Sequence, residues 1–242
     1  MRRTLRLLGT LLVGAGALTL VWVVLVWQWQ DPFTALYTHI QQTRLSHAYD
    51  REAASFKPVV TAHRDLASVQ RSLATEAATY RRSLRRGDAV GRIEIGRIGL
   101  NMVVVQGTDH DTLEKGPGHY TPSALPGQGH LIYVAGHRTT YLAPFAYIDD
   151  IRVGDYVKFE VPYGTFTYRV TRHYVVDDNA LQVLADHGRE ILRLQACHPR
   201  FFATHRYIVD ARLVSVAPKG APAYTLSPSR LAAGSAVSWL PL

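Results

Sequence analysis

The sequence contains a single cysteine, Cys197, among its 242 residues. One cysteine excludes an internal disulfide, so covalent cross-links cannot hold this fold together. The count alone leaves two roles open for Cys197. It is either a small buried core residue or a reactive thiol.

The globular part also lacks a marked excess of charge of one sign. The whole chain has a formal net charge of +8, but residues 91–242 hold 15 Lys and Arg against 13 Asp and Glu. The one dense basic cluster, residues 81–86, fits a solvated helix face, or contact with an anionic wall polymer or lipid, better than DNA. We therefore expect no nucleic-acid partner.

One long hydrophobic run is present near the N-terminus. Residues 7–27 carry no charge, and as a helix they are long enough to cross a hydrocarbon core of about 30 Å. Arg2, Arg3 and Arg6 precede this run, so the positive-inside rule places residues 1–6 in the cytoplasm. Because no small-residue cleavage site follows it, we predict an uncleaved signal anchor and a single-pass protein of the cell membrane with an extracytoplasmic body.

Residues 28–90 are polar and show little strand pattern. Apolar residues recur every three or four positions from Val69 to Leu84, which predicts a helix with one apolar face. We interpret this region as a helical stalk between the membrane and the domain. Asp31-Pro32-Phe33 fits a helix start with proline at the first position, and the alternative is a lid over the active site.

From residue 91 the pattern changes to short β-rich runs separated by glycine, proline and aspartate. The predicted strands are residues 91–95, 100–106, 130–136, 156–161, 164–176, 190–196 and 206–216, and residues 178–187 fit a short helix or turn. Strands without long intervening helices predict an all-β barrel or sandwich. We assign residues 91–217 to this domain and residues 218–242 to a C-terminal tail.

Cys197 lies at the end of one predicted strand, and Arg206 begins the next. The loop of residues 198–205 then holds a thiol and a guanidinium at neighbouring strand ends. A positive charge next to a thiol favours the reactive thiolate, and an arginine can also stabilise an oxyanion. His137 closes another predicted strand, where an imidazole can act as a general acid toward a leaving amine; a surface-loop histidine is the alternative.

Two motifs of the sequence resemble those of the sortases, the membrane-anchored cysteine transpeptidases of bacterial surfaces. These motifs are Ala135-Gly136-His137-Arg138 and Leu194-Gln195-Ala196-Cys197-His198-Pro199, with Arg206 nine residues after the cysteine. The resemblance covers residues 91–216, and the sequence is most similar to actinobacterial class E or class D sortases. It implies a closed eight-stranded sortase-type β-barrel, preceded here by a transmembrane helix and a helical stalk.

The resemblance also implies roles for individual residues. Cys197 is the implied nucleophile toward an LPxTG-like sorting signal, His137 the implied general acid and base, and Arg206 the implied oxyanion donor. The product is a thioacyl enzyme, which an amine from a peptidoglycan precursor or a pilin resolves. Four further residues are implied in substrate binding: Ala196, His198, Tyr141 and Thr139. Ordinary packing is an equal alternative for Tyr141.

The sequence departs from the family pattern at Ala196, where many sortases have a hydrogen-bonding threonine before the cysteine. His198 is also nearer to Cys197 in sequence than His137 is, and competes for the role of base. Loop carboxylates at Asp109, Asp111 and Glu114 offer a calcium site, but such carboxylates are usually solvated, so we expect no metal and no cofactor.

Two functions other than that of a sortase are also compatible with a single cysteine in a β-rich domain. A cell-wall L,D-transpeptidase uses similar chemistry, but the Ser-x-Gly-Cys-x-Arg pattern expected there is absent from the sequence. A membrane-tethered β-barrel that only binds a partner would need Cys197 merely as a buried structural residue. Accessibility of the thiol distinguishes this binding module from an enzyme.

Overall fold

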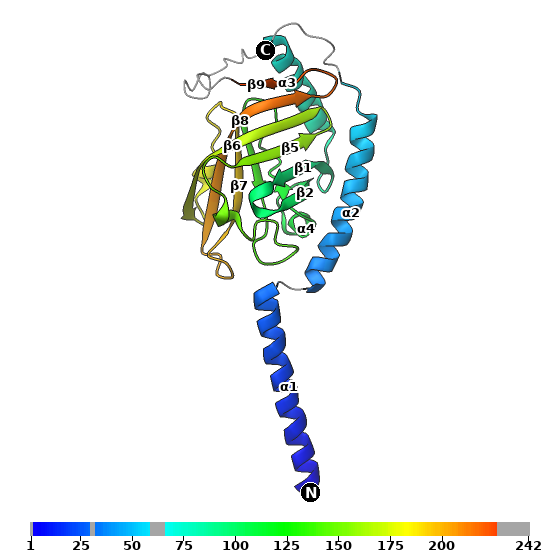
Figure 1. Cartoon of the computed structure of the whole chain (residues 1–242), viewed down its shortest axis with the longest axis vertical. Helices are drawn as coiled ribbons and strands as arrows, with labels where there is room; N and C mark the ends of the chain where they lie inside the picture. The colour runs from blue at the N-terminus through cyan, green and yellow to red at the C-terminus, as the bar shows by residue number, and fades with distance from the viewer. Residues whose placement is uncertain (1, 30–31, 59–65, 227–242) are drawn as a thin grey trace.

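The computed structural model describes residues 2–29, 32–58 and 66–226. Three helices precede the β-rich part: α1 (Arg2–Trp29), α2 (Pro32–Ser55) and α3 (Leu66–Ser83). Figure 1 shows α1 projecting away from a globular body that holds all the other elements. The predicted helical nature of the region before the barrel is confirmed, whereas Asp31, part of the candidate lid motif, lies outside the described residues.

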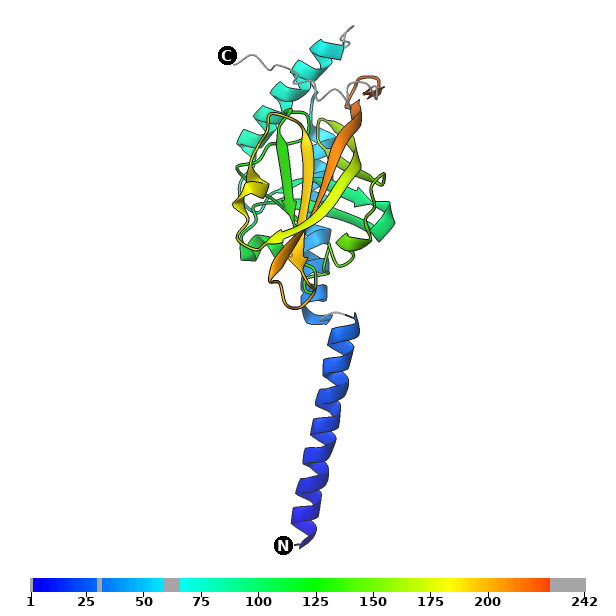
Figure 2. The same cartoon turned by 90° about the vertical axis from the view of Figure 1, so that its left-hand side faces the viewer.

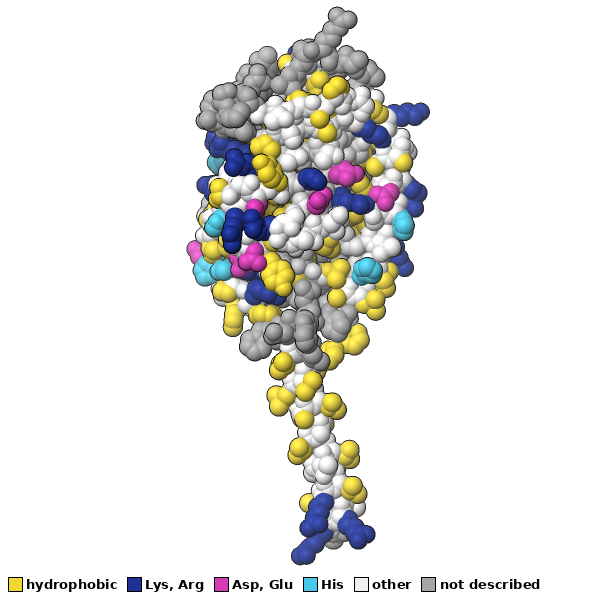
Figure 3. All heavy atoms as spheres, viewed as in Figure 1, with side chains coloured by type: hydrophobic (Ala, Val, Ile, Leu, Met, Phe, Trp, Pro, Cys, Tyr) yellow, Lys and Arg dark blue, Asp and Glu magenta, His cyan; other side chains and the backbone are white. Residues whose placement is uncertain are grey.

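The helix α1 has the length and composition of a membrane span. Its segment Arg2–Val24 has a mean hydropathy of 2.2, and all its side chains are exposed. Figure 3 shows hydrophobic side chains along this helix and Lys or Arg side chains at its free end. An N-terminal apolar helix of this kind is either a signal anchor or a signal sequence.

Eight strands form a closed barrel, and a ninth lies outside the ring. Hydrogen bonding joins them in the order β6, β5, β1, β2, β3, β4, β7 and β8, and a β6–β8 pairing closes the ring. Two of the pairs are parallel, β2 with β3 and β4 with β7, and the other pairs are antiparallel. The strands are β1 (Ala89–Ile95), β2 (Leu100–Gln106), β3 (Gly118–His119), β4 (Leu131–Ala135), β5 (Tyr156–Val161), β6 (Gly164–Asp177), β7 (Ile191–His198), β8 (His205–Pro218) and β9 (Tyr224–Thr225).

The predicted eight-stranded barrel is therefore confirmed. The sequence pattern missed the two-residue strands β3 and β9, which are too short to show an alternation. Short helical turns connect some of the strands: η1 (Gly96–Ile98), α4 (His110–Leu113), η2 (Ile148–Asp150) and η3 (Leu181–Leu184). The turn η3 lies inside residues 178–187, where a short helix or turn was expected.

Alternating side chains fill the barrel. In β5, exposed and buried residues alternate from Tyr156 to Val161, as expected for a strand with one face on the core. The core includes Phe159, Phe166, Leu192 and Leu194, each fully buried. Figure 2 shows the long strands β6, β7 and β8 crossing the face that carries the candidate site.

Both helices that follow α1 pack against the barrel. In α3, Leu73, Ala77 and Tyr80 enter the barrel core, which confirms the predicted apolar face. In α2, the Gln42 amide accepts a hydrogen bond from the backbone of Val103 at 2.8 Å and donates one to it at 3.0 Å. The region predicted as a stalk is thus held on the surface of the barrel.

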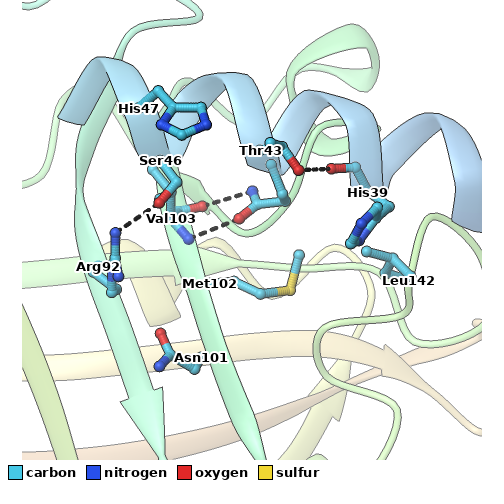
Figure 4. Close-up of a pocket in the computed structure, with 10 residues that line it drawn as sticks. His39, Thr43, Ser46, His47, Arg92, Asn101, Met102, Val103 and Leu142 are labelled. Carbon is cyan, nitrogen blue, oxygen red and sulfur yellow. Dashed lines mark hydrogen bonds between the residues drawn. The ribbon is translucent and has the colours of Figure 1, made fainter. Parts of the chain in front are cut away.

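A pocket of about 350 Å³ lies between α2 and strands β1 and β2. Figure 4 shows Arg92 of β1 reaching across it to Ser46 of α2, at a distance of 2.8 Å. Its lining includes Leu142 but none of Cys197, His137 and Arg206.

Candidate active site

Cys197 lies on the outer face of the barrel, near the end of β7. Along this strand Leu192, Leu194 and Ala196 point into the core, so the alternating residues Gln195 and Cys197 face outward. Cys197 is a free, partly exposed thiol. This partial exposure distinguishes Cys197 from the fully buried residues of the barrel core.

Arg206 of β8 is the direct cross-strand neighbour of Cys197 in the antiparallel β7–β8 ladder. Residues opposite each other in such a ladder present their side chains on the same face. The Nη1 atom of Arg206 donates hydrogen bonds to the carbonyl oxygens of Ala203 and His205, at 2.8 and 2.9 Å. These bonds fix the guanidinium beside the thiol, at the start of β8.

His137 flanks Cys197 on the other side. Strand β4 runs parallel to β7 with Ala135 paired to Gln195, and the amide of Gly136 donates to the carbonyl of Gln195 at 3.0 Å. Two residues further along, His137 is level with Cys197. The strand register thus places the backbone of His137, just after β4, next to Cys197 of β7, which in turn pairs with Arg206 of β8.

The imidazole of His137 is partly buried. Among the described residues its Nε2 atom is buried without a hydrogen-bond partner. Burial lowers the pKa of His137 below its usual value, and the charge of His110 lowers this pKa further, while Glu114 opposes both effects. His137 is therefore neutral at pH 7.

Tyr141 covers the imidazole of His137. Their ring centroids lie 5.1 Å apart. The hydroxyl of Tyr141 donates to Glu114 Oε1 at 2.7 Å, and His110 Nε2 lies 3.2 Å from the same oxygen. The amide of Tyr141 also donates to Thr34 Oγ1 of α2 at 3.2 Å. The loop that follows His137 is thus bound to both α4 and α2.

That loop has an unusual backbone. Tyr141, Leu142 and Ala143 have φ angles of 55°, 59° and 38°, a conformation that costs about 1–2 kcal/mol per residue for L-amino acids. At its base, a Cβ on Gly136 would lie 2.7 Å from the ring of Phe145, so only glycine fits there. Strain of this kind is concentrated at functional sites.

Arg138 connects the histidine loop to the cysteine strand, and it was not singled out as a site residue from the sequence. Its side chain is 3% exposed, and Nη1 donates to the carbonyl of Cys197 at 3.3 Å and to His198 Nδ1 at 2.9 Å. Its Nη2 pairs with Asp149 at 2.5 Å. A charged residue directly after a strand-end histidine was the available signal.

The four residues predicted to bind substrate lie in different surroundings. Ala196 is 1% exposed within the core, so its side chain is not accessible to a ligand. His198 alternates with Cys197 along β7 and is bonded to Arg138, so its ring is on the other face and does not adjoin the sulfur. Thr139 and Tyr141 are partly exposed in the histidine loop.

The outer face beside Cys197 is apolar. A second cluster of buried residues lies on this face, outside the barrel core: Tyr133, Ala135, Val183 and Ile208. Underneath η3, Arg193 and Asp210 form a buried ion pair with an Nε–Oδ1 distance of 2.6 Å. Arg193 also donates to the carbonyl oxygen of Val183, which ties the η3 segment to the barrel.

The carboxylates considered for calcium each have protein partners. Asp109 caps α4 through Thr112, Asp111 pairs with Arg86 at 3.9 Å, and Glu114 accepts from Tyr141. Within residues 2–29, 32–58 and 66–226, no cluster of three or more His, Cys, Asp or Glu side chains is placed to hold a metal ion.

A cysteine between a histidine and an arginine, on the outer face of a closed mixed barrel, is the arrangement of a cysteine-dependent acyltransferase. A model of the sortase domain matches residues 93–214. The chain belongs to the sortase family, whose members are cysteine transpeptidases.

Individual relatives agree with this assignment. The chain is 35% identical over 133 residues to Sortase D of Bacillus subtilis (strain 168), which covers 53% of this chain and 66% of that protein. It resembles the solved structure of sortase E from Streptomyces avermitilis, with 32% identity, a TM-score of 0.51, and coverage of 57% of this chain and 97% of that one.

A third relative is similar in fold. For a Sortase D5 transpeptidase of Clostridium perfringens, the TM-score is 0.59 at 23% identity, over 72% of this chain and 98% of that one. The predicted similarity to class D and class E sortases is therefore confirmed. The chain spans just under two thirds of the length of the curated relatives it matches.

Proposed function

We propose that this protein is a membrane-anchored sortase that cleaves an LPxTG-like sorting signal between threonine and glycine. The released acyl group would pass to an amine of a peptidoglycan precursor or of a pilin. The observation that carries the proposal is the pairing of Cys197 with Arg206 across β7 and β8, with His137 two residues beyond the end of the parallel strand β4.

The first half-reaction forms a thioacyl enzyme. His137 is neutral at pH 7 because burial lowers its pKa, so it can take the thiol proton of Cys197. The sulfur attacks the threonine carbonyl, and Arg206 donates hydrogen bonds to the resulting oxyanion. When the carbon–nitrogen bond breaks, His137 returns the proton to the departing glycine amine.

The second half-reaction reverses these roles. An incoming amine attacks the thioester carbonyl, and Arg206 again stabilises the oxyanion. His137 removes a proton from the attacking amine and returns it to the sulfur as the carbon–sulfur bond breaks. Because His137 transfers each proton and the sulfur carries the acyl group, the proposed reaction requires neither a metal nor a cofactor.

The test uses the full-length protein in detergent with a panel of pentapeptide sorting signals. Cleavage should be lost in Cys197→Ala and strongly reduced in His137→Ala and Arg206→Ala, whereas His187→Ala, at an exposed site on η3's flank, should match the parent. Full cleavage by the Cys197→Ala protein would refute the proposal. Resistance of Cys197 to a small alkylating reagent at neutral pH would instead favour the binding module.

We also propose that α1 stays attached as a signal anchor. The uncharged run of residues 7–27 supports a membrane span, and the arginines before this run support an N-terminus in the cytoplasm. Mass analysis of the protein extracted from membranes tests the point. An intact α1 is expected, and a mature chain that begins after α1 would identify it as a cleaved signal sequence.

A further inference from the structure

The helix α2 has an outward face with exposed apolar side chains at its start. Its inward residues Thr38, Gln42 and Tyr49 contact the barrel through hydrogen bonds or burial. On the opposite side of the first two turns lie four exposed apolar side chains: Phe33 (73% exposed), Leu36 (61%), Tyr37 (39%) and Ile40 (43%). Their spacing of three and four places them in one stripe along the helix.

The apolar stripe is short, and basic residues follow it on the same side of α2. From Phe33 to Ile40 the helix rises by about 10 Å, so the stripe is confined to the part of α2 that follows α1 most closely. Further along the same side, the exposed residues become Arg44, His47 and Arg51. The change from apolar to basic side chains along one face is typical of a helix that leaves a lipid headgroup layer.

The chain itself indicates what covers the stripe. Only residues 30–31 separate α1 from α2, so the two helix ends are at most about 10 Å apart. The ring of Phe33 lies 5.9 Å from that of Trp22 in α1. If α1 spans a bilayer, as proposed above, the stripe begins at the surface of that same bilayer.

A second apolar feature lies at the same end of the barrel. The loop between β7 and β8 exposes Phe201 (53%) and Phe202 (77%). The guanidinium of Arg200 lies over the rings of Tyr147 and Phe201, at 5.7 and 5.4 Å. Figures 1 and 2 both show this loop and the start of α2 at the end of the barrel next to α1, and Figure 3 shows hydrophobic side chains there.

We infer that the first two turns of α2 and the β7–β8 loop insert into the headgroup layer of the bilayer that α1 spans. The partner is therefore a lipid surface, contacted by aromatic and aliphatic side chains with arginine at the edge. Because the loop follows β7 directly, Cys197 then lies beside the membrane, where substrates and acceptors held in the bilayer can reach it. This inference rests on the anchoring proposed for α1.

The experiment places one fluorescent label at a time on the full-length protein. The Cys197→Ser protein has no cysteine and serves as the background. In this background, Leu36→Cys or Phe202→Cys carries an environment-sensitive fluorophore. Each labelled protein is reconstituted in vesicles of phosphatidylglycerol and phosphatidylcholine. Arg51→Cys, on the outward face of α2 beyond the stripe, is the matched control, and Leu12→Cys reports on α1. Each labelled protein should melt at the temperature of the Cys197→Ser parent.

We expect a blue-shifted emission for labels at positions 36 and 202, with quenching by brominated lipids several-fold stronger than at position 51. Quenching at position 12 without quenching at 36 or 202 would overturn the inference and leave the anchor intact. Absence of quenching at position 12 would instead contradict the anchor. A blue shift at position 36 that persists in detergent and grows with protein concentration would identify a second copy as the partner and refute the lipid contact.

Discussion

Arg138 donates a hydrogen bond to the backbone carbonyl of Cys197 at 3.3 Å, so the residue after the candidate general acid is bound to the candidate nucleophile. The same guanidinium reaches His198 and Asp149 and is almost fully buried. A planar group with several donors can hold a loop and a strand in register. Arg138 therefore positions His137 relative to Cys197 without touching either reacting atom.

Replacing Arg138 by methionine should lower kcat strongly and change KM little, because the side-chain volume is kept while the link between loop and strand is lost. It also leaves Asp149 without its partner, which should reduce the melting temperature. Arg189→Met, at an exposed position, is the control. The positioning role predicts a lower kcat even at temperatures where the variant is fully folded; normal kcat there would contradict it.

The pH dependence of activity should respond to the two charges near His137. Glu114 raises the pKa of His137 and His110 lowers it. If His137 must be neutral to accept the thiol proton, the rate falls as the pH drops through its pKa. Glu114→Gln should then move the acidic limb of the pH–rate profile to lower pH, and His110→Gln should move it to higher pH. If the acidic limb of the pH–rate profile does not move in either variant, it reflects the titration of a group other than His137.

The Arg206→Lys variant tests whether activity depends on the positive charge of Arg206 alone or also on the geometry of its guanidinium. Lysine keeps the positive charge but lacks the planar fork that bonds to Ala203 and His205 and aims the remaining donors at the oxyanion. Loss of one such donor typically lowers kcat by about 10²–10³-fold. We expect a loss of this size in steady-state cleavage, and none for Arg169→Lys on the exposed side of β6. Equal activity of the Arg206→Lys protein would show that charge alone is sufficient.

His119 should make the barrel sensitive to acid. It is fully buried, with Nδ1 at 2.8 Å from Gln106 Oε1 and Nε2 at 2.9 Å from the carbonyl of Ala124. Burial lowers the pKa of His119 to about 4 from its usual 6.5. The unfolded chain therefore takes up a proton first, and stability present above pH 6.5 is lost as the pH falls toward 4, by about 3 kcal/mol in all.

Melting temperatures of the detergent-solubilised protein between pH 7 and 4 test this expectation. His119→Gln should be less stable than the parent at pH 7 but should lose less stability over that range. The exposed His187→Gln should follow the parent. Parallel pH curves for all three proteins would assign the acid sensitivity to other groups.

Strands with clear alternation and the Cys197–Arg206 pairing were predictable from the sequence. A loop between two strands brings their adjoining ends together, so nine residues of separation suffice to place these side chains side by side. The position of His137 needed more information, because the strand before it, β4, pairs in parallel with β7, with Ala135 opposite Gln195, and these partners are far apart in the sequence. The family motif supplied what spacing alone did not.

The packing of α2 was not predictable. Its contacts with the barrel depend on polar side chains, such as Gln42 bonding to the backbone of Val103 and Thr38 donating to the carbonyl of Glu114 at 2.7 Å. Such contacts leave no apolar periodicity for a pattern search to detect. The inward direction of Arg138 was hidden for a similar reason, since a charged residue in a loop is normally expected to face solvent.

The candidate nucleophile stands on the outside of the closed sheet and not in its interior. An extended peptide can lie along this open surface with chain continuing freely from both of its ends. For the function proposed above, a polypeptide of any size can be processed as long as one short unfolded stretch reaches Cys197, because the substrate does not have to enter the barrel.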